Sequence, residues 1–345
     1  MTHSFQRYTA AGNTFVVMNT WEDPLSLSRE EMRAFVQAAC DYKNGIGADG
    51  VILINQPAPR IAGDAPGLSP RRGEEKNPAD FRMDFYNPDG TTGMLCGNGA
   101  RCAVEAARKF DFVAGSHTNF EVLGAMNPAE ILPNGDIRVY FQDPKIIRLN
   151  FKLPLEEGHE VSASYVDLGS QHVVIFFEEL TKNPLLFKEG ALAKNPLLFK
   201  EGAGGGRLGK ARGTTLEDFP IAHYGALVRW HPEFAPVGTN ANFIEVREDG
   251  EEHYLRIRTF ERGVEGETLA CGTGCMSAAI VARMTERIAK TPIRLLTQSG
   301  EFVTVNFSVS GEHVSNLSLE GTVVRGEEGT LTFDEETKQF DVVYL

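Results

Sequence analysis

The feature that most constrains this chain is a short motif, Cys-Gly-x-Gly, which occurs once in each half of the sequence. Cys96 opens the first copy and Cys271 opens the second. Each copy is followed by a run typical of a helix, ARCAVEAARKF after the first and CMSAAIVARMTERIAK after the second. We therefore expect two similar halves of mixed α+β class, each of which places one cysteine at the start of a helix.

A helix start can change the chemistry of a thiol. The helix dipole or a nearby cation can lower the pKa of a cysteine from near 8.5 to about 3.5–7.5. The exposed N–H groups of the glycines form a site for an anion such as a carboxylate. A single cysteine beside glycine is usually a packing residue, but two matching copies favour a functional pair. Two thiols on opposite faces of one carbon could remove a proton and return another, which inverts a stereocentre.

Length and charge exclude several classes of protein. A chain of 345 residues suits two domains, and a net charge of -13 argues against a general nucleic-acid binder. No stretch approaches the roughly 20 apolar residues that span a bilayer, and the N-terminal segment does not resemble a signal peptide. We expect a cytoplasmic protein that binds neither nucleic acid nor membrane.

The cysteines indicate a reducing compartment. They number five, and their spacing is unlike that of a disulfide framework. Zinc is a weaker alternative, because CxxC pairs and an HExxH run are both missing from the sequence. Cys102 and Cys275 fall inside the expected helices, where we interpret them as core residues.

The pattern of apolar residues predicts more strands than helices. Residues 28–42 have helical periodicity with Ser28 as the N-cap, and HYGALVRWHPEF at 223–234 is also helix-like. Strands are expected on both sides of a turn at Gly12-Asn13, and at 51–54, 80–87, 119–123, 136–141, 166–168, 173–177, 242–246, 254–260, 295–298, 302–307 and within 323–345.

Two segments interrupt this pattern. Residues 57–78 are rich in proline, glycine and charge, which is typical of a flexible loop. Residues 182–213 contain the sequence KNPLLFKEGA twice, at Lys182–Ala191 and Lys194–Ala203. Two copies with a short period are too few for a solenoid. We interpret both segments as inserted flexible loops.

Further motifs accompany the two cysteines. CGNGARC at 96–102 and ERGVEGETLACGTG at 261–274 resemble the two active-site signatures of diaminopimelate epimerases. GNTF at 12–15, GIGADG at 45–50, DFRMDFYNPDG at 80–90 and GTNANFIEV at 238–246 resemble further family blocks in the same order. The resemblance implies two halves related by pseudo-twofold symmetry, each a strand-rich, barrel-like sheet around a central helix, with the active site in the cleft between them. The implied halves are 1–141, to which 329–345 return, and 142–328.

The resemblance also implies a reaction. The family interconverts LL- and meso-2,6-diaminopimelate, precursors of lysine and peptidoglycan, without pyridoxal phosphate or metal. On this sequence, Cys96 and Cys271 would be acid and base on opposite faces of the α carbon, with no cofactor. The resemblance also implies a homodimer. His172 and Glu261 would help to set the protonation of the cysteines. The implied substrate contacts are Asn13, Asn87, Gly97, Asn98, Asn240, Glu261, Arg262, Gly272 and Thr273.

Some residues depart from the family pattern. Gly50 stands where many members carry a polar contact, and Ser170-Gln171 replaces a common Asn-Pro pair. Proline racemase-like enzymes are the nearest alternative, but Asn98 stands where their pattern carries a histidine. A non-catalytic amino-acid-binding relative and a thiol redox sensor are alternatives of a different class.

Overall fold

The chain forms two compact units. The computed structural model describes residues 2–57, 79–93, 95–156, 159–182, 215–250, 252–334 and 340–345. One unit contains Met1–Phe141 together with Asn316–Leu345, and the other is the continuous segment Gln142–Ser315. The chain returns to the first unit at Asn316, earlier than the boundary of 329 expected from the sequence. The reason is that β16 (His313–Gly321) pairs with β7 (Ile137–Tyr140) of that unit.

The two expected loops lie almost entirely outside the described residues. Of the segments 57–78 and 182–213, only Pro57 and Lys182 are described. The KNPLLFKEGA repeat falls in the second segment. Its interpretation as an inserted loop therefore stays a prediction.

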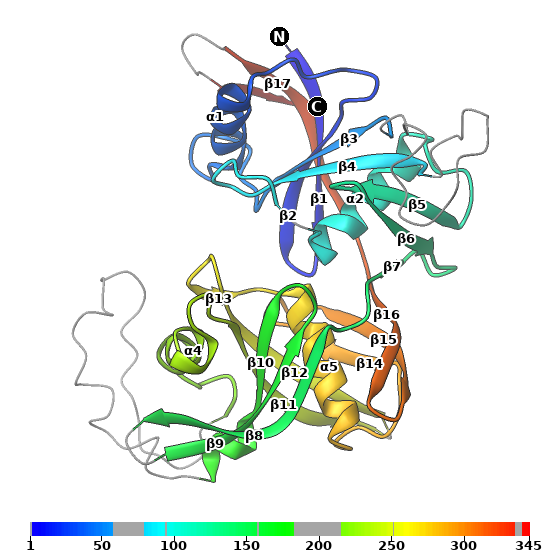
Figure 1. Cartoon of the computed structure of the whole chain (residues 1–345). Coiled ribbons are helices and arrows are strands. Elements are labelled where there is room, and N and C mark those ends of the chain that lie inside the picture. The colour runs from blue at the N-terminus through cyan, green and yellow to red at the C-terminus, as the bar shows by residue number, and fades with distance from the viewer. Residues whose placement is uncertain are drawn as a thin grey trace, which may run out of the picture. The chain divides into compact units, whose positions relative to one another are not determined.

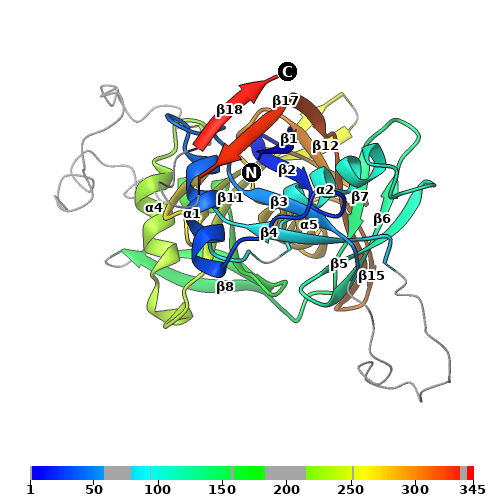
Figure 2. The same ribbon diagram turned by 90° about the horizontal axis from the view of Figure 1, so that it is seen from above.

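The first unit is built on one continuous sheet. Its other strands are β1 (Thr2–Ala10), β2 (Asn13–Asn19), β3 (Val51–Asn55), β4 (Phe81–Tyr86), β5 (His117–Val122), β6 (Ala125–Ile131), β17 (Val324–Phe333) and β18 (Phe340–Tyr344). Neighbours pair in the order β18–β17–β1–β2–β3–β4–β5–β6–β7–β16. Figure 1 labels β17 and β1 to β7 of this order. β2–β3 and β4–β5 are parallel, and the other pairs are antiparallel. Figure 2 shows β18 beside β17, which in turn pairs with β1.

Helix α1 (Arg29–Cys40) begins where the sequence predicts. Ser28 accepts a hydrogen bond from the Glu31 N–H, and the Glu31 carboxylate accepts one from the Ser28 N–H. This reciprocal capping box satisfies two N–H groups that a helix start otherwise leaves unbonded. Phe35, Val36 and Ala39 form the buried face of the helix.

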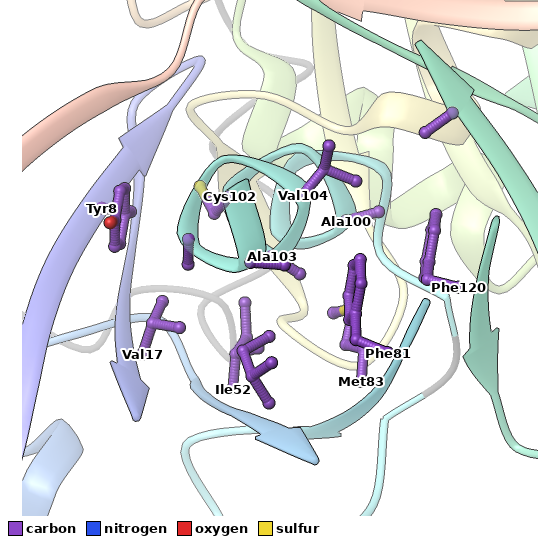
Figure 3. Packing of buried hydrophobic residues seen from close by; sticks show 14 of the residues in the cluster. Tyr8, Val17, Ile52, Phe81, Met83, Ala100, Cys102, Ala103, Val104 and Phe120 are labelled. Carbon is purple, nitrogen blue, oxygen red and sulfur yellow. The ribbon is translucent and has the colours of Figure 1, made fainter. Parts of the chain in front are cut away.

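Helix α2 (Gly97–Lys109) is the centre of the first unit. Its alanines and Cys102 are completely buried, and they pack against apolar side chains from β1 to β7. Figure 3 shows Tyr8, Ile52, Met83 and Phe120 gathered around this helix. All residues of this helix except Glu105, Arg108 and Lys109 are buried, so strands surround most of its surface. Its small side chains allow the strands to approach it closely.

The second unit repeats this plan. Its strands are β8 (Ile146–Glu156), β9 (His159–Asp167), β10 (Gln171–Phe176), β11 (Asn240–Asp249), β12 (Glu252–Glu261), β13 (Gly266–Thr268), β14 (Ile293–Leu296) and β15 (Phe302–Ser310). Its helices are α3 (Phe177–Thr181), α4 (Ile221–Arg229) and α5 (Gly272–Met284), with a 3-10 turn, η3 (Pro232–Phe234). The buried helix α5 packs against β9, β10, β11, β12, β14 and β15. Among the described helices of the chain, none is long and apolar enough to cross a membrane.

Strand pairing follows the same order in both units. The pairs along β17–β1–β2–β3–β4–β5–β6 are antiparallel, antiparallel, parallel, antiparallel, parallel and antiparallel. The pairs along β8–β9–β10–β11–β12–β14–β15 have this same order. A helical crossover joins the two strands of each parallel pair, as parallel pairing requires. The expected α+β class with two similar, strand-rich halves around central helices is confirmed.

Candidate active site

Each unit places one cysteine at the start of its central helix. Cys96 is the N-cap of α2, and Cys271 is the N-cap of α5, both with extended backbone. The Cys96 sulfur accepts a hydrogen bond from the Gly99 N–H at 3.5 Å. Gly97 and Gly272 are the first helical residues, and the N–H groups of a first turn point toward incoming anions. The predicted positions of the two cysteines are therefore confirmed.

A chain of polar side chains lies beside Cys96. Asn98 donates to the Asn13 side-chain oxygen at 2.6 Å and accepts from the Arg101 guanidinium at 2.9 Å. The Asn13 amide nitrogen faces a carboxylate oxygen of Asp49 at 3.4 Å, and the Thr14 N–H donates to that same oxygen at 2.9 Å. Asn13 and Asn98, both predicted as substrate contacts, are thus brought together.

Arg101 and Asp49 were not among the predicted site residues. Arg101 has no exposed surface, whereas the other charged residues of α2, which are Glu105, Arg108 and Lys109, are not buried. Buried charged groups are rare unless they have partners, so the burial of Arg101, and not its local sequence, marks it. Asp49 lies in GIGADG, where the carboxylate holds the start of β2 through Thr14.

The Cys271 thiol lies against the carboxyl group of Glu261. Burial raises the pKa of Cys271 well above its usual value, and the negative charge of Glu261 adds to this effect. Burial also raises the pKa of Glu261, whereas hydrogen bonds from Thr268 and from Cys271 oppose the rise. The expected lowering by the helix start does not dominate at Cys271, because burial and the carboxylate outweigh the dipole. Ionisation of Glu261 therefore disfavours ionisation of Cys271.

His172 reaches Cys271 through one intervening residue. Its Nε2 atom lies 2.9 Å from the Thr273 hydroxyl oxygen, which lies 3.5 Å from the Cys271 sulfur. Its Nδ1 atom lies 3.2 Å from the side-chain nitrogen of Asn242. Burial and then the charge of Arg262 lower the pKa of His172 to about 3, so the ring is neutral at pH 7. Asn242 was not among the predicted site residues, although it occurs in the GTNANFIEV block.

Arg262 and Asn240 form a third group. The Arg262 guanidinium donates to the Gln171 side-chain oxygen at 2.7 Å, and the Arg262 N–H donates to the Asn240 side-chain oxygen at 2.8 Å. Asn240 also donates to the backbone oxygen of Gln171 at 2.8 Å and to the Ser170 hydroxyl at 3.1 Å. Ser170 and Gln171 thus hold the two predicted substrate contacts in this structure.

Contacts within the first unit account for the residues at positions 87 and 50. The Asn87 side chain donates to Thr91 at 3.1 Å within its own turn. A Cβ atom at Gly50 would lie 2.5 Å from the Phe85 ring and 2.8 Å from the Tyr86 backbone oxygen. Position 50 therefore has no room for the side chain that many members of the resembled family carry.

Comparison with known proteins identifies the family. The model of the diaminopimelate epimerase family matches residues 5–147 and 215–323. The chain belongs to the diaminopimelate epimerase family. It is therefore an isomerase of the epimerase type. Across its described residues, no cluster of three or more His, Cys, Asp or Glu side chains is arranged to hold a metal ion.

Curated relatives match nearly the whole chain. A diaminopimelate epimerase of Aquifex aeolicus is 32% identical over 95% of this chain and 97% of its own length. A diaminopimelate epimerase of Chlorobaculum tepidum is 30% identical over 94% of this chain and 99% of its own length.

Solved structures share the fold at much lower identity. A PhzF-family phenazine biosynthesis protein of Bacillus anthracis has a TM-score of 0.64 at 15% identity, and covers 96% of this chain and 100% of its own. A hydroxyproline epimerase of Agrobacterium vitis has a TM-score of 0.60 at 13% identity, and covers 98% of this chain and 94% of its own. These two likenesses support the two-unit α+β fold.

Proposed function

We propose that this chain interconverts LL- and meso-2,6-diaminopimelate by two-base proton transfer. The observation that carries the proposal is the matching placement of Cys96 and Cys271, each at the N-cap of the central helix of its unit. The identity of the substrate is inferred from the family and from the names of the relatives. The products would serve lysine and peptidoglycan synthesis, and a cytoplasmic homodimer is part of the proposal.

The proposed reaction begins at the α carbon of the substrate. One cysteine, as a thiolate, takes the α proton, and the other, as a thiol, delivers a proton to the opposite face. The stereocentre is inverted, and the two cysteines exchange protonation states. In this proposal Glu261, which is hydrogen-bonded to Cys271, takes the proton that the Cys271 thiol must lose before it acts as a base.

Negative charge that develops on the substrate carboxylate needs preorganised donors. We assign this role to the first-turn N–H groups at Gly97-Asn98 and Gly272-Thr273, since both sets lie at helix starts. Arg262 suits a carboxylate because its guanidinium can bind both oxygens at once. In this proposal Asn13, Asn87 and Asn240 contact polar groups of the substrate, and the protein chain supplies every acid, base and donor.

Solvent exchange tests the proposal directly. The reduced protein is incubated with LL-diaminopimelate in deuterated water, and the product is analysed by mass spectrometry and chiral chromatography. We expect the meso isomer to form with deuterium at the inverted α carbon. L-Proline and trans-4-hydroxy-L-proline are run in parallel. Inversion of these imino acids without inversion of diaminopimelate would replace the proposal with a proline racemase-like function, and a lack of exchange with every substrate would reject catalysis.

A further inference from the structure

We propose that Asn242 is a positioning residue that fixes the tautomer of His172 and thereby turns the Thr273 hydroxyl proton toward the Cys271 sulfur. The inference rests on the proposed function in one respect, which is that Cys271 is a reacting group. Its geometry lies entirely within the second unit, on β10, β11, β12 and the first turn of α5.

The orientation of the Asn242 side chain is determined by its neighbours. Its nitrogen lies 2.9 Å from the backbone oxygen of Val173, and its oxygen lies 3.0 Å from the Thr259 hydroxyl. A backbone carbonyl can only accept a hydrogen bond, so the NH₂ group must face Val173. Asn242 has no exposed surface, which prevents water from replacing these partners. The NH₂ group therefore also faces His172.

This orientation determines which ring nitrogen of His172 carries the proton. The Asn242 nitrogen lies 3.2 Å from Nδ1, and as a donor it requires Nδ1 to accept. A neutral imidazole with an accepting Nδ1 carries its proton on Nε2. Nε2 must then donate to the Thr273 oxygen, 2.9 Å away.

The tautomer in turn directs the hydroxyl of Thr273. Because its oxygen accepts from His172, its own proton can turn to the Cys271 sulfur at 3.5 Å. In the opposite tautomer, Nε2 would accept the Thr273 proton, and an oxygen lone pair would face the sulfur. A hydroxyl that donates stabilises a thiolate, whereas a lone pair destabilises it. Asn242 thus acts on Cys271 through two intervening residues, His172 and Thr273.

A close contact between α5 and β11 holds this arrangement together. A Cβ atom at Gly274 would lie only 2.5 Å from the Asn242 side-chain oxygen and 3.3 Å from the Thr259 hydroxyl oxygen. The first turn of α5 is therefore pressed against the same asparagine that orients His172. The other charged or titratable neighbours in this part of the unit are Glu261 and Cys275, which act on Cys271, and Arg262, which acts on His172.

The first experiment reads the tautomer by ¹⁵N NMR of the intact protein labelled at histidine. We expect the His172 ring, assigned by its loss in His172→Gln, to show protonated Nε2 and unprotonated Nδ1 throughout pH 6–9. In Asn242→Leu, signals of the Nδ1-protonated form should appear. The control Thr259→Val removes the other side-chain partner of Asn242 but keeps its donation to His172, so the wild-type tautomer should persist. A wild-type ring protonated on Nδ1 would overturn the inference.

The second experiment measures how fast iodoacetamide alkylates Cys271 as a function of pH, with the site located by peptide mass. In Thr273→Val, loss of the donor should raise the apparent pKa by about one unit, which is a roughly tenfold lower rate at a fixed pH below that pKa. Thr273→Ser keeps the hydroxyl and should restore the wild-type profile. Equal profiles for the Val and Ser variants would contradict the inference.

Neither experiment uses diaminopimelate, so their outcome is separate from that of the proposed function. If Asn242→Leu does not fold, the wild-type tautomer and the paired Thr273 variants still decide the matter. A protein that showed the expected tautomer and alkylation profiles but did not invert diaminopimelate would refute the proposed function alone.

Discussion

The thiol of Cys271 is surrounded by groups with opposing effects on its charge. Burial and Glu261 disfavour the thiolate, whereas the Thr273 hydroxyl and the Gly274 N–H favour it. The disfavouring effects dominate, so the pKa of Cys271 is raised and the proton stays on sulfur. A substrate that approaches with its own positive charge would change this balance. The charges around Cys271 therefore help to determine when its thiol ionises in the proposed reaction.

Replacing each cysteine separately tests the two-base scheme. A positioned acid or base contributes about 10²–10⁴-fold to a rate. We expect Cys96→Ala and Cys271→Ala each to lower kcat for epimerisation at least about 100-fold, as measured by meso-diaminopimelate formation. Cys102→Ala removes a buried thiol from the same helix as Cys96 and should retain activity within a few fold. Full activity in either of the first two variants would contradict the scheme.

Replacing Glu261 by glutamine should separate charge from proton transfer. Loss of the negative charge should make Cys271 alkylation faster at a given pH, while the loss of a proton acceptor should lower kcat. The raised pKa of Glu261 also affects stability, because it means that folding disfavours the charged carboxylate. The protonated Glu261 contributes favourably to the free energy of unfolding below the pKa that this carboxyl has in the unfolded chain. This contribution is lost as the pH rises through the pKa in the folded protein.

As the pH rises from about 4 to about 7, we therefore expect the unfolding free energy of Glu261→Gln to increase relative to that of the wild type. Urea unfolding at the two pH values measures this change. Glu312→Gln, which removes an exposed carboxylate, is the matched control and should show no such gain. An unchanged difference between Glu261→Gln and wild type at the two pH values would contradict the assignment.

The buried ring of His172 makes a separate prediction about pH. Its folded pKa of about 3 lies below the ordinary value of 6.5. Its contribution to stability is present above the unfolded pKa and decreases as pH falls, at about 1.4 kcal/mol per pH unit within that window. Between pH 6.5 and 5, wild type should lose about 2 kcal/mol of unfolding free energy that His172→Gln does not lose. Urea unfolding measures this loss, and a similar change in the exposed control His117→Gln would refute the assignment.

The two helix starts differ in how much space they allow. A Cβ atom at Gly99 would meet Ile52, Cys96 and Met83 at 3.4–3.5 Å, which is ordinary contact. The Cβ atom at Gly274 would meet a buried and fully bonded asparagine at 2.5 Å. The similar motifs Cys-Gly-Asn-Gly and Cys-Gly-Thr-Gly thus tolerate different changes.

Alanine substitutions should reveal this difference. Gly274→Ala should lower the unfolding free energy by about 1–3 kcal/mol, since the new methyl group displaces Asn242. Gly99→Ala should have a much smaller effect, because alanine favours a helix over glycine by up to about 1 kcal/mol and this offsets the tighter contact. Urea unfolding of both variants measures the effect. An equal loss in the two variants would contradict the difference in space.

Sequence patterns predicted elements best where the signals were local. Ser28 and its capping box predicted the start of α1, and the residues after each cysteine predicted α2 and α5. Strands β6, β8, β13 and β16 were missed, and only the last two residues of β9 were expected to be extended. β8 contains Pro154 and a register shift near Asn150, whose φ is 53°, so its apolar residues do not alternate regularly. A strand of this kind is defined mainly by its partner β9.

The contacts that build the site are not local, and sequence alone could not predict them. His172 and Thr273 are joined across 101 positions, and Asn98 and Asn13 across 85. The family motifs named these residues, but only the fold shows which of them are bonded. Asn242 and Asp49 lay within quoted motifs and were missed, because nothing in their local sequence indicates a histidine or a strand start as partner.

At the scale of the whole molecule, the second unit is a self-contained segment. Gln142–Ser315 has its own core, made by residues of β8 to β12 and α4, and its own buried central helix. A domain with these properties is expected to fold alone. The repeated order of strand pairing supports this, because every pair in that order is formed within the segment.

Expression of residues 142–315 tests this independence. We expect a cooperative thermal transition and a dispersed NMR spectrum, with no epimerase activity because Cys96 is missing. A fragment of residues 142–300 is the control. It lacks β15, whose Val303, Val305 and Phe307 are buried, and should fail to fold cooperatively. Two fragments that both fail to fold would show that the second unit depends on the first.

The pairing of β1 with β17 has a consequence for synthesis on the ribosome. β1 is among the first segments made, yet one of its two neighbours, β17, follows the entire second unit. Until then, one side of β1 presents unpaired backbone groups, which are a template for aggregation. The nascent chain must therefore keep an open sheet edge while some 170 further residues are translated and folded. Slow translation or the loss of chaperones should harm the N-terminal unit more than the segment inserted in it.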